Sequence, residues 1–129
     1  MLKFNKVLLA SDFDNTLVYT QGALERGEDI PPMSARNREA VEYFIQNGGY
    51  FSISTGRALP AFARYAKDLP CNAPCVIANG AAIYDFAAGR YLCTAFLPER
   101  IRDHVLQLTA EMPDLTFEIY HDDNSIHAL

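Results

Sequence analysis

Two aspartates, Asp12 and Asp14, flank a phenylalanine in the sequence DFDNTL, directly after a short apolar run. Two-residue spacing at the end of a strand directs both carboxylates to the same side of the chain. Such a pair suits a two-step group transfer, in which one carboxylate attacks the substrate and the other exchanges protons with the leaving group and with water. Its negative charge also suits Mg²⁺. The alternative is ordinary turn chemistry, with both carboxylates bonded to local N–H groups.

A second polar group, Thr55-Gly56-Arg57, stands between another apolar run and a predicted helix. A hydroxyl, a glycine amide and a helix N-terminus together form an arrangement that binds phosphate, and Arg57 adds a fork of N–H donors. The alternative is an ordinary helix start, with Thr55 as the N-cap and Arg57 in solvent. A third polar pair, Asn79-Gly80, follows the next apolar run and by itself is only a turn signal.

The segments before these groups read as strands, and helices are predicted between them. The predicted strands are residues 6–11, 50–54 and 75–78, and the first is expected to be buried on both faces. Ser34 is the predicted N-cap of the first helix, which Gly48 and Gly49 end. The second helix is predicted over residues 58–69. The apolar faces predicted for these helices are Val41, Phe44 and Ile45 in the first, and Leu59, Phe62, Ala63 and Ala66 in the second.

This β-α-β-α-β order predicts an α/β fold with a parallel sheet and right-handed crossovers. Ligands of such sheets bind beyond the carboxyl ends of the strands, where all three polar groups fall. After residue 80 the pattern changes to a hairpin of residues 82–84 and 91–96, with Gly89 in its turn. A helix opened by Pro98 follows, with an apolar face of Ile101, Val105, Leu108 and Met112, and then a strand over residues 115–120.

Together the three polar groups resemble those of the haloacid dehalogenase-like hydrolases, specifically the Cof-type phosphatases, which carry a large cap after the third strand. The residues that carry the resemblance are Asp12-Phe13-Asp14-Asn15-Thr16-Leu17, Ser54-Thr55-Gly56-Arg57 and Ala78-Asn79-Gly80-Ala81. The resemblance implies that residues 1–80 are the N-terminal part of a Rossmann-like core domain with three parallel strands. Residues 81–129 are then the beginning of an α+β cap. Asn15 stands where the family often has glycine, and asparagine tolerates the left-handed backbone that this turn needs.

The resemblance also implies roles for these residues in a Mg²⁺-dependent hydrolysis of a small phosphorylated metabolite. Asp12 is the expected nucleophile, which becomes an aspartyl phosphate, and a metal ligand. Asp14 is the expected general acid and base, and its backbone carbonyl also binds the metal. Thr55 and Gly56 are expected to hold phosphate oxygens, and Arg57 and Asn79 to lie near the substrate. Phosphomutase activity is a variant of the same chemistry.

The family also uses a later lysine and a later acidic motif, and neither has a match in these 129 residues. Lys67 lies within the second predicted helix, and Asp122 and Asp123 follow a cap-like strand. Two carboxylates facing a phosphate repel it by about several kcal/mol at close range, which the metal and the lysine normally offset. We therefore expect this chain alone to be a poor or inactive catalyst. The alternative is a non-catalytic phosphate-binding or regulatory module.

Composition restricts the partners and the compartment. Sixteen acidic residues against eleven Lys and Arg give a formal charge of −5, which argues against a nucleic-acid groove. The apolar run of residues 7–10 is too short for a membrane span or a leader peptide. Three cysteines do not suggest a disulfide scaffold or a zinc site. These features predict a soluble cytoplasmic protein.

Two further expectations concern the edges of the fold. The resemblance implies that the first strand is central in the sheet and that its second neighbour comes from a part of the fold absent from these residues, which leaves an apolar edge open. We expect that the chain either self-associates along this edge or was cut from a longer chain. His121, Asp122, Asp123 and His127 form a polar cluster near the end of the sequence. Their spacing matches no usual zinc pattern, so we interpret them as a solvated tail.

Overall fold

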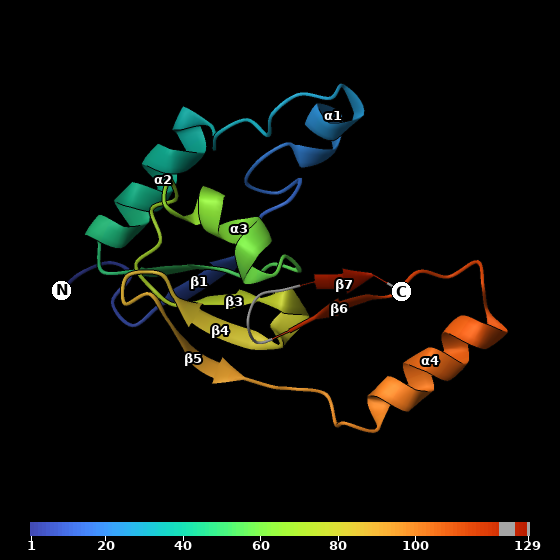
Figure 1. Cartoon of the computed structure of the whole chain (residues 1–129). Helices are drawn as coiled ribbons and strands as arrows, with labels where there is room; N and C mark the ends of the chain where they lie inside the picture. Colours follow the sequence, from blue (N-terminus) through green and yellow to red (C-terminus); the bar gives the residue numbers. More distant parts are fainter. Residues whose placement is uncertain (122–125, 129) are drawn as a thin grey trace. The chain divides into compact units, whose positions relative to one another are not determined.

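The computed structural model describes residues 1–121 and 126–128 (Figure 1). The chain divides into two compact units, Met1–Thr94 and Ala95–Leu129. The first unit contains β1 (Leu8–Ser11), α1 (Thr20–Glu25), α2 (Ala35–Gln46), β2 (Tyr50–Ile53), α3 (Leu59–Ala66), β3 (Cys75–Ile77), a short 3₁₀ turn (Ala78–Gly80), β4 (Ala82–Asp85) and β5 (Arg90–Thr94). The second contains α4 (Ile101–Glu111), β6 (Glu118–Tyr120) and β7 (Ile126–Ala128). The predicted division between core and cap after residue 80 stays a prediction.

The parallel pairing predicted for the first strands is confirmed. β1 and β2 pair in parallel, with Leu8 opposite Tyr50 and Ser11 opposite Ile53. β3 continues this arrangement through a single parallel bridge between Ser54 and Val76, whereas with β4 it forms a full antiparallel ladder. The preceding residue, Pro74, has no N–H to donate to β2, and its carbonyl instead accepts from the Ser52 hydroxyl at 2.6 Å.

Local signals at the helix ends explain where the helices begin and end. The Ser34 side chain accepts from the Asn37 N–H at 3.2 Å and caps α2, and Gly48, with φ +91°, follows its last turn. Pro60 lies in the first turn of α3, where its missing N–H costs nothing. In Figure 1, α2 and α3 lie on the same side of the strands of the first unit. The core between them is centred on Phe13, Phe51, Ile53, Phe62, Cys75 and Ile77.

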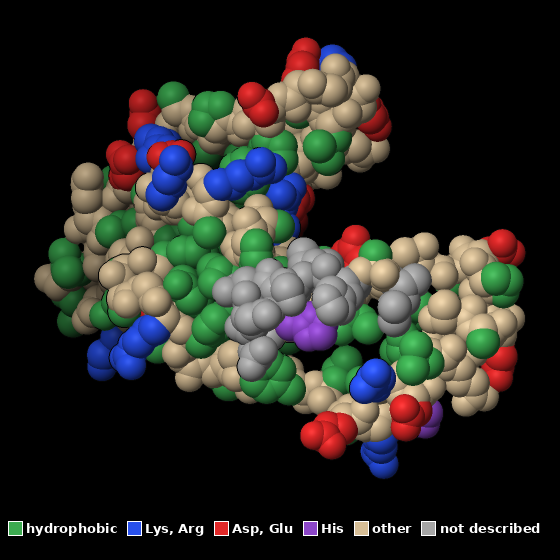
Figure 2. Space-filling view, in the orientation of Figure 1, with side chains coloured by type: hydrophobic (Ala, Val, Ile, Leu, Met, Phe, Trp, Pro, Cys, Tyr) green, Lys and Arg blue, Asp and Glu red, His purple; other side chains and the backbone are tan. Residues whose placement is uncertain are grey.

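Two predictions of burial are wrong. The first strand was expected to be buried on both faces, but Leu8 is 62% exposed and Leu9 is 46% exposed. The reason is that β1 ends the strand order of its sheet and both crossover helices cover the same face. Figure 2 shows hydrophobic side chains on the surface over the strands of this unit. On α3, Ala63 is exposed and Tyr65 is half-buried in its place.

The predicted hairpin is present as β4 and β5, with Gly89 at φ +64° in the turn between them. The segment between Asp14 and Ser34, for which no element was predicted, contains the six-residue helix α1. The three cysteines are free thiols, and Cys75 is buried in the core.

The second unit consists of α4 and the antiparallel pair of β6 and β7. On the predicted face of α4, Ile101 and Val105 are half-buried, whereas Leu108 and Met112 are exposed. Among the described residues, none of the helices has the length and apolar character required to cross a bilayer. Asp122, Asp123 and the side chain of His127 lie outside the part of the chain that is described.

Candidate functional site

The polar groups predicted after the three strands lie at one edge of the sheet. The Ser54 N–H donates to the Ser11 carbonyl at 2.8 Å, which joins the carboxyl ends of β1 and β2. The Thr55 N–H donates to the Val76 carbonyl, and the Ala78 N–H donates to the Arg57 carbonyl, both at 2.9 Å. These bonds align the end of β3 with the end of β2. The arrangement follows from parallel pairing, which places carboxyl ends together.

Asp14 and Arg57 form a bidentate ion pair across this edge. Arg57 Nε donates to one carboxylate oxygen of Asp14 at 2.8 Å, and an Nη donates to the other at 2.7 Å. The side chains are 20% exposed for Arg57 and 31% exposed for Asp14, so the pair is partly shielded from water. The hydrogen bonds from Arg57 lower the pKa of Asp14 below its ordinary value of 3.8, although partial burial opposes the change. Asp14 is therefore an oriented carboxylate at neutral pH.

Asp12 differs from Asp14 in its surroundings. Its side chain is exposed, and one carboxylate oxygen accepts from the Thr16 hydroxyl at 2.9 Å. The turn that follows has Asn15 at φ +57°, which confirms that asparagine fills the left-handed position. The Asn15 side-chain oxygen accepts from the Gln21 N–H at 3.0 Å and so ties the turn to α1. Among the described residues, the second carboxylate oxygen of Asp12 accepts no hydrogen bond and forms no salt bridge.

Thr55 and Gly56 form a tight turn between β2 and α3. The Thr55 side chain is buried, and its hydroxyl oxygen accepts from the Arg57 N–H at 3.2 Å. The helix starts later than an N-cap at Thr55 requires, because Ala58 is the N-cap of α3. A Cβ on Gly56 would lie 2.7 Å from the Asn79 side-chain oxygen, so the absence of a side chain lets these turns approach. Asn79 itself has a left-handed backbone, with φ +54°.

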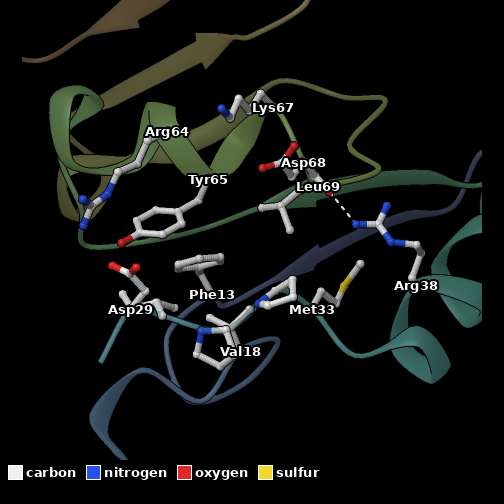
Figure 3. Close-up of a pocket in the computed structure, with 13 residues that line it drawn as sticks. Phe13, Val18, Asp29, Met33, Arg38, Arg64, Tyr65, Lys67, Asp68 and Leu69 are labelled. Carbon is white, nitrogen blue, oxygen red and sulfur yellow. Dashed lines mark hydrogen bonds between the residues drawn. The ribbon is translucent and has the colours of Figure 1, made fainter. Parts of the chain in front are cut away.

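A cavity of about 370 Å³ lies beside this edge, and Figure 3 shows its lining. Phe13 and Tyr65 contribute aromatic surface to it, and its lining residues do not include Asp12 or Asp14. Lys67, which the sequence argument excluded from the phosphate-binding role, lines this cavity. The cavity therefore adjoins the strand-end site through Phe13 and Tyr65 and does not contain the two aspartates.

The oxygen atoms at the end of β1 are of the type that Mg²⁺ prefers. The Asp12 carboxylate and the Asp14 main-chain carbonyl fit a partial set of ligands, because Mg²⁺ commonly keeps several waters. The Asp14 carboxylate is already engaged by Arg57. Within residues 1–121 and 126–128, no group of three or more His, Cys, Asp or Glu side chains could hold a metal ion.

The sequence profile of the haloacid dehalogenase-like hydrolases matches residues 9–128. The chain belongs to this family. The matched range includes the three polar groups at the strand ends. No curated protein sequence matches the chain significantly.

Solved structures of the family share the fold. A phosphatase of the superfamily from Bacteroides thetaiotaomicron superposes with a TM-score of 0.73 at 19% identity, covering 97% of this chain and 41% of its own. A subclass IIB sugar phosphatase gives a TM-score of 0.66 at 16% identity, and the match covers 95% of this chain and 44% of that one. A haloacid dehalogenase-like hydrolase from B. subtilis gives a TM-score of 0.59 at 23% identity, and the match covers 88% of this chain and 36% of that one. The chain spans less than half the length of these structures.

Sequence reasoning missed three contributors to this hydrolase's site. Thr16 was quoted in the first motif without a role, yet its hydroxyl bonds Asp12. The sequence gives Phe13 and Tyr65 no role in the site, yet both rings contact Arg57. The four-residue spacing from Asp12 to Thr16 is a signal that points to the first contact. No sequence signal points to the contacts of Tyr65.

Proposed function

We propose that this chain carries the nucleophile and acid–base half of a Mg²⁺-dependent, Cof-type phosphohydrolase. Its substrate would be a small phosphorylated metabolite, because the two carboxylates and the Thr55–Arg57 turn handle a phosphate group. The observation that supports this most is the Asp14–Arg57 ion pair, which links the acid motif after β1 to the phosphate-binding motif after β2. The solved phosphatases with the same fold agree with this assignment.

The proposed reaction has two steps. A carboxylate oxygen of Asp12 attacks phosphorus, the bond to the leaving oxygen breaks, and Asp14 delivers a proton to that oxygen. Asp14 then removes a proton from water, which attacks the aspartyl phosphate and breaks the bond between phosphorus and Asp12. Thr16 orients the Asp12 carboxylate through its 2.9 Å hydrogen bond. The Thr55 hydroxyl and the Gly56 amide would bind phosphate oxygens.

Bound Mg²⁺ would neutralise charge on the phosphate, and Asp12 and the Asp14 carbonyl are the residues proposed to hold it. The Arg57 ion pair favours ionised Asp14, the form that accepts a proton from water in the second step. Protonated Asp14, needed in the first step, requires this ion pair to loosen. Arg57 thus sets which protonation state of Asp14 dominates.

A second candidate is a phosphate-binding module without turnover. The feature that favours it is the small ligand set, since one exposed carboxylate and one carbonyl remain for a metal. Lys67 lines the neighbouring cavity and does not complete the site. Both candidates share the phosphate-binding turn and differ in whether a covalent intermediate forms.

Titration of the ¹⁵N-labelled chain with Mg²⁺ and then with inorganic phosphate tests the proposed site. We expect Mg²⁺ to shift the amide signals of residues 12–15 and phosphate to shift those of residues 55–57 and 79. Asp12→Asn is expected to remove the response to Mg²⁺. Phosphate shifts confined to the cavity residues Arg64 and Lys67 would contradict the assignment.

Hydrolysis of p-nitrophenyl phosphate tests the expected weakness of the chain alone. Without a lysine beside the phosphate, we expect slow turnover or none, because the repulsion from two carboxylates is not offset. Rapid hydrolysis that Asp12→Asn abolishes would show that these 129 residues are sufficient.

A further inference from the structure

The Arg57 guanidinium is held by two aromatic rings as well as by Asp14. Its central carbon lies 5.5 Å from the centroid of the Phe13 ring and 5.2 Å from the centroid of the Tyr65 ring. The two rings contact each other, with centroids 5.4 Å apart. Cations within about 6 Å of a ring centroid are attracted by the negative face of the ring. The two rings therefore stabilise the position of the Arg57 guanidinium in the ion pair.

These contacts come from separate parts of the fold. Phe13 lies between Asp12 and Asp14 and is fully buried, where it also packs edge-to-face on Phe62. Tyr65 is half-buried on α3, eight residues after Arg57 in the sequence. Figure 3 shows the Tyr65 ring beside Phe13, with its hydroxyl directed toward Asp29. Phe13 is held in place by the core, so Tyr65 is the one of these two rings whose position can change.

We propose that Tyr65 is a positioning residue that holds the Arg57 guanidinium against Asp14. This inference rests on the proposed function, in which Asp14 is the acid and base. Arg57 has an alternative partner in the phosphate that the adjacent Thr55–Gly56 turn would bind. The ring of Tyr65 favours the conformation directed to Asp14, because leaving it forfeits the cation–π contact. Arg57 then acts on the reaction through Asp14 and is no direct phosphate ligand in the resting site.

The ring, and not only its bulk, is what the proposal requires. Phenylalanine at residue 65 keeps the π face and loses the hydroxyl, which also interacts with Arg57. Leucine keeps apolar bulk and loses both the π face and the hydroxyl. Tyr43 on α2 supplies a matched control, because its ring contacts Phe4 at 6.2 Å and the Lys3 ammonium at 5.6 Å. It therefore makes the same kinds of contact away from the site.

The test measures solvent exchange of the Arg57 Nε proton by NMR in the whole chain, with no metal or phosphate added. This proton is protected when it is bonded to Asp14, so its exchange rate reports how often the guanidinium leaves. We expect Tyr65→Leu and Tyr65→Ala to accelerate exchange about tenfold, on the scale of a partly desolvated cation–π contact. Tyr65→Phe, which keeps the ring, should accelerate exchange less than Tyr65→Leu does, and Tyr43→Ala should stay within about twofold of the parent chain.

Equal protection in Tyr65→Leu and Tyr65→Phe would overturn the proposal, because simple packing would then suffice. Amide spectra establish that each variant is folded, and Tyr65→Leu serves if Tyr65→Ala fails to fold. The measurement uses no phosphate chemistry, so its failure is distinguishable from failure of the proposed function. The chain could give no NMR response to Mg²⁺ or phosphate while the Tyr65 variants still change Arg57 Nε exchange as expected. That result would refute the proposed function and support the positioning role of Tyr65.

Discussion

The Asp14–Arg57 ion pair predicts a measurable stabilisation of the first unit. Its charges are roughly 4 Å apart, which corresponds to about 4 kcal/mol at an effective dielectric of 20. Desolvation and screening reduce this value, because Asp14 is 31% exposed. Two charge-assisted hydrogen bonds remain, and we expect Arg57→Gln to lower the free energy of unfolding by about 2 kcal/mol. Urea unfolding of the whole chain, followed by circular dichroism, measures this change.

A double-mutant cycle with Arg57→Gln and Asp14→Asn isolates the pair from other effects of each substitution. We expect a coupling energy of about 1–2 kcal/mol at neutral pH. The matched control is the pair Arg26–Glu28, which has the same 2.8 Å contact but side chains 62% and 57% exposed. Its coupling should be about 0.5 kcal/mol or less. Equal coupling in the two cycles would refute the argument that partial burial strengthens the Asp14 pair.

The coupling energy between Asp14 and Arg57 is expected to change with pH in a defined direction. The folded-state pKa of Asp14 lies below its ordinary value of 3.8, because Arg57 hydrogen bonds the ionised form. The pair therefore contributes fully above the unfolded-state pKa, and this contribution is lost as the pH falls through the folded-state pKa. We expect the coupling energy to be constant near neutral pH and to decline below 3.8. Coupling that grows on acidification would show that the sign is wrong.

Substitutions at three further positions test other parts of the account. Asn15→Ala should lower the free energy of unfolding by about 1 kcal/mol and Asn15→Gly by less, because of the left-handed backbone, as thermal unfolding can measure. Gly56→Ala should displace the Asn79 side chain, whose oxygen lies 2.7 Å from the added Cβ, and unchanged Asn79 NMR signals would contradict the close approach. We also propose that the open edge of β1 drives self-association, which Leu8→Lys should reduce in size-exclusion chromatography. A monomer with slow amide exchange in residues 7–9 would count against this.

Structural features that depend on nearby residues were predictable from the sequence. Ser34 and Gly48 specify the ends of α2 through hydrogen bonds and a backbone angle that involve only nearby residues. The apolar runs predicted β1, β2 and β3 within one or two residues, because short apolar runs bounded by polar or turn residues favour strands. The left-handed backbone of Asn15 was predictable because the family resemblance implies such a turn there and asparagine tolerates it.

Features that depend on distant partners were not predictable. Arg57 and Asp14 lie 43 residues apart, and nothing in either motif indicates that the guanidinium bonds the second aspartate in place of a phosphate. The exposure of Leu8 depends on which face α2 and α3 cover, which an apolar run does not encode. Tyr65 lies outside the motifs, so its contact with Arg57 emerges only when α3 packs beside Phe13.

Covalent phosphorylation tests the central claim most directly. The chain is incubated with Mg²⁺ and acetyl phosphate, quenched in acid and mapped by peptide mass spectrometry. The account predicts one added phosphoryl group on Asp12, dependent on Mg²⁺, absent in Asp12→Asn, and longer-lived in Asp14→Asn because the base that activates water is missing. A phosphoryl group that persists in Asp12→Asn, or one that maps to a residue other than Asp12, would contradict it.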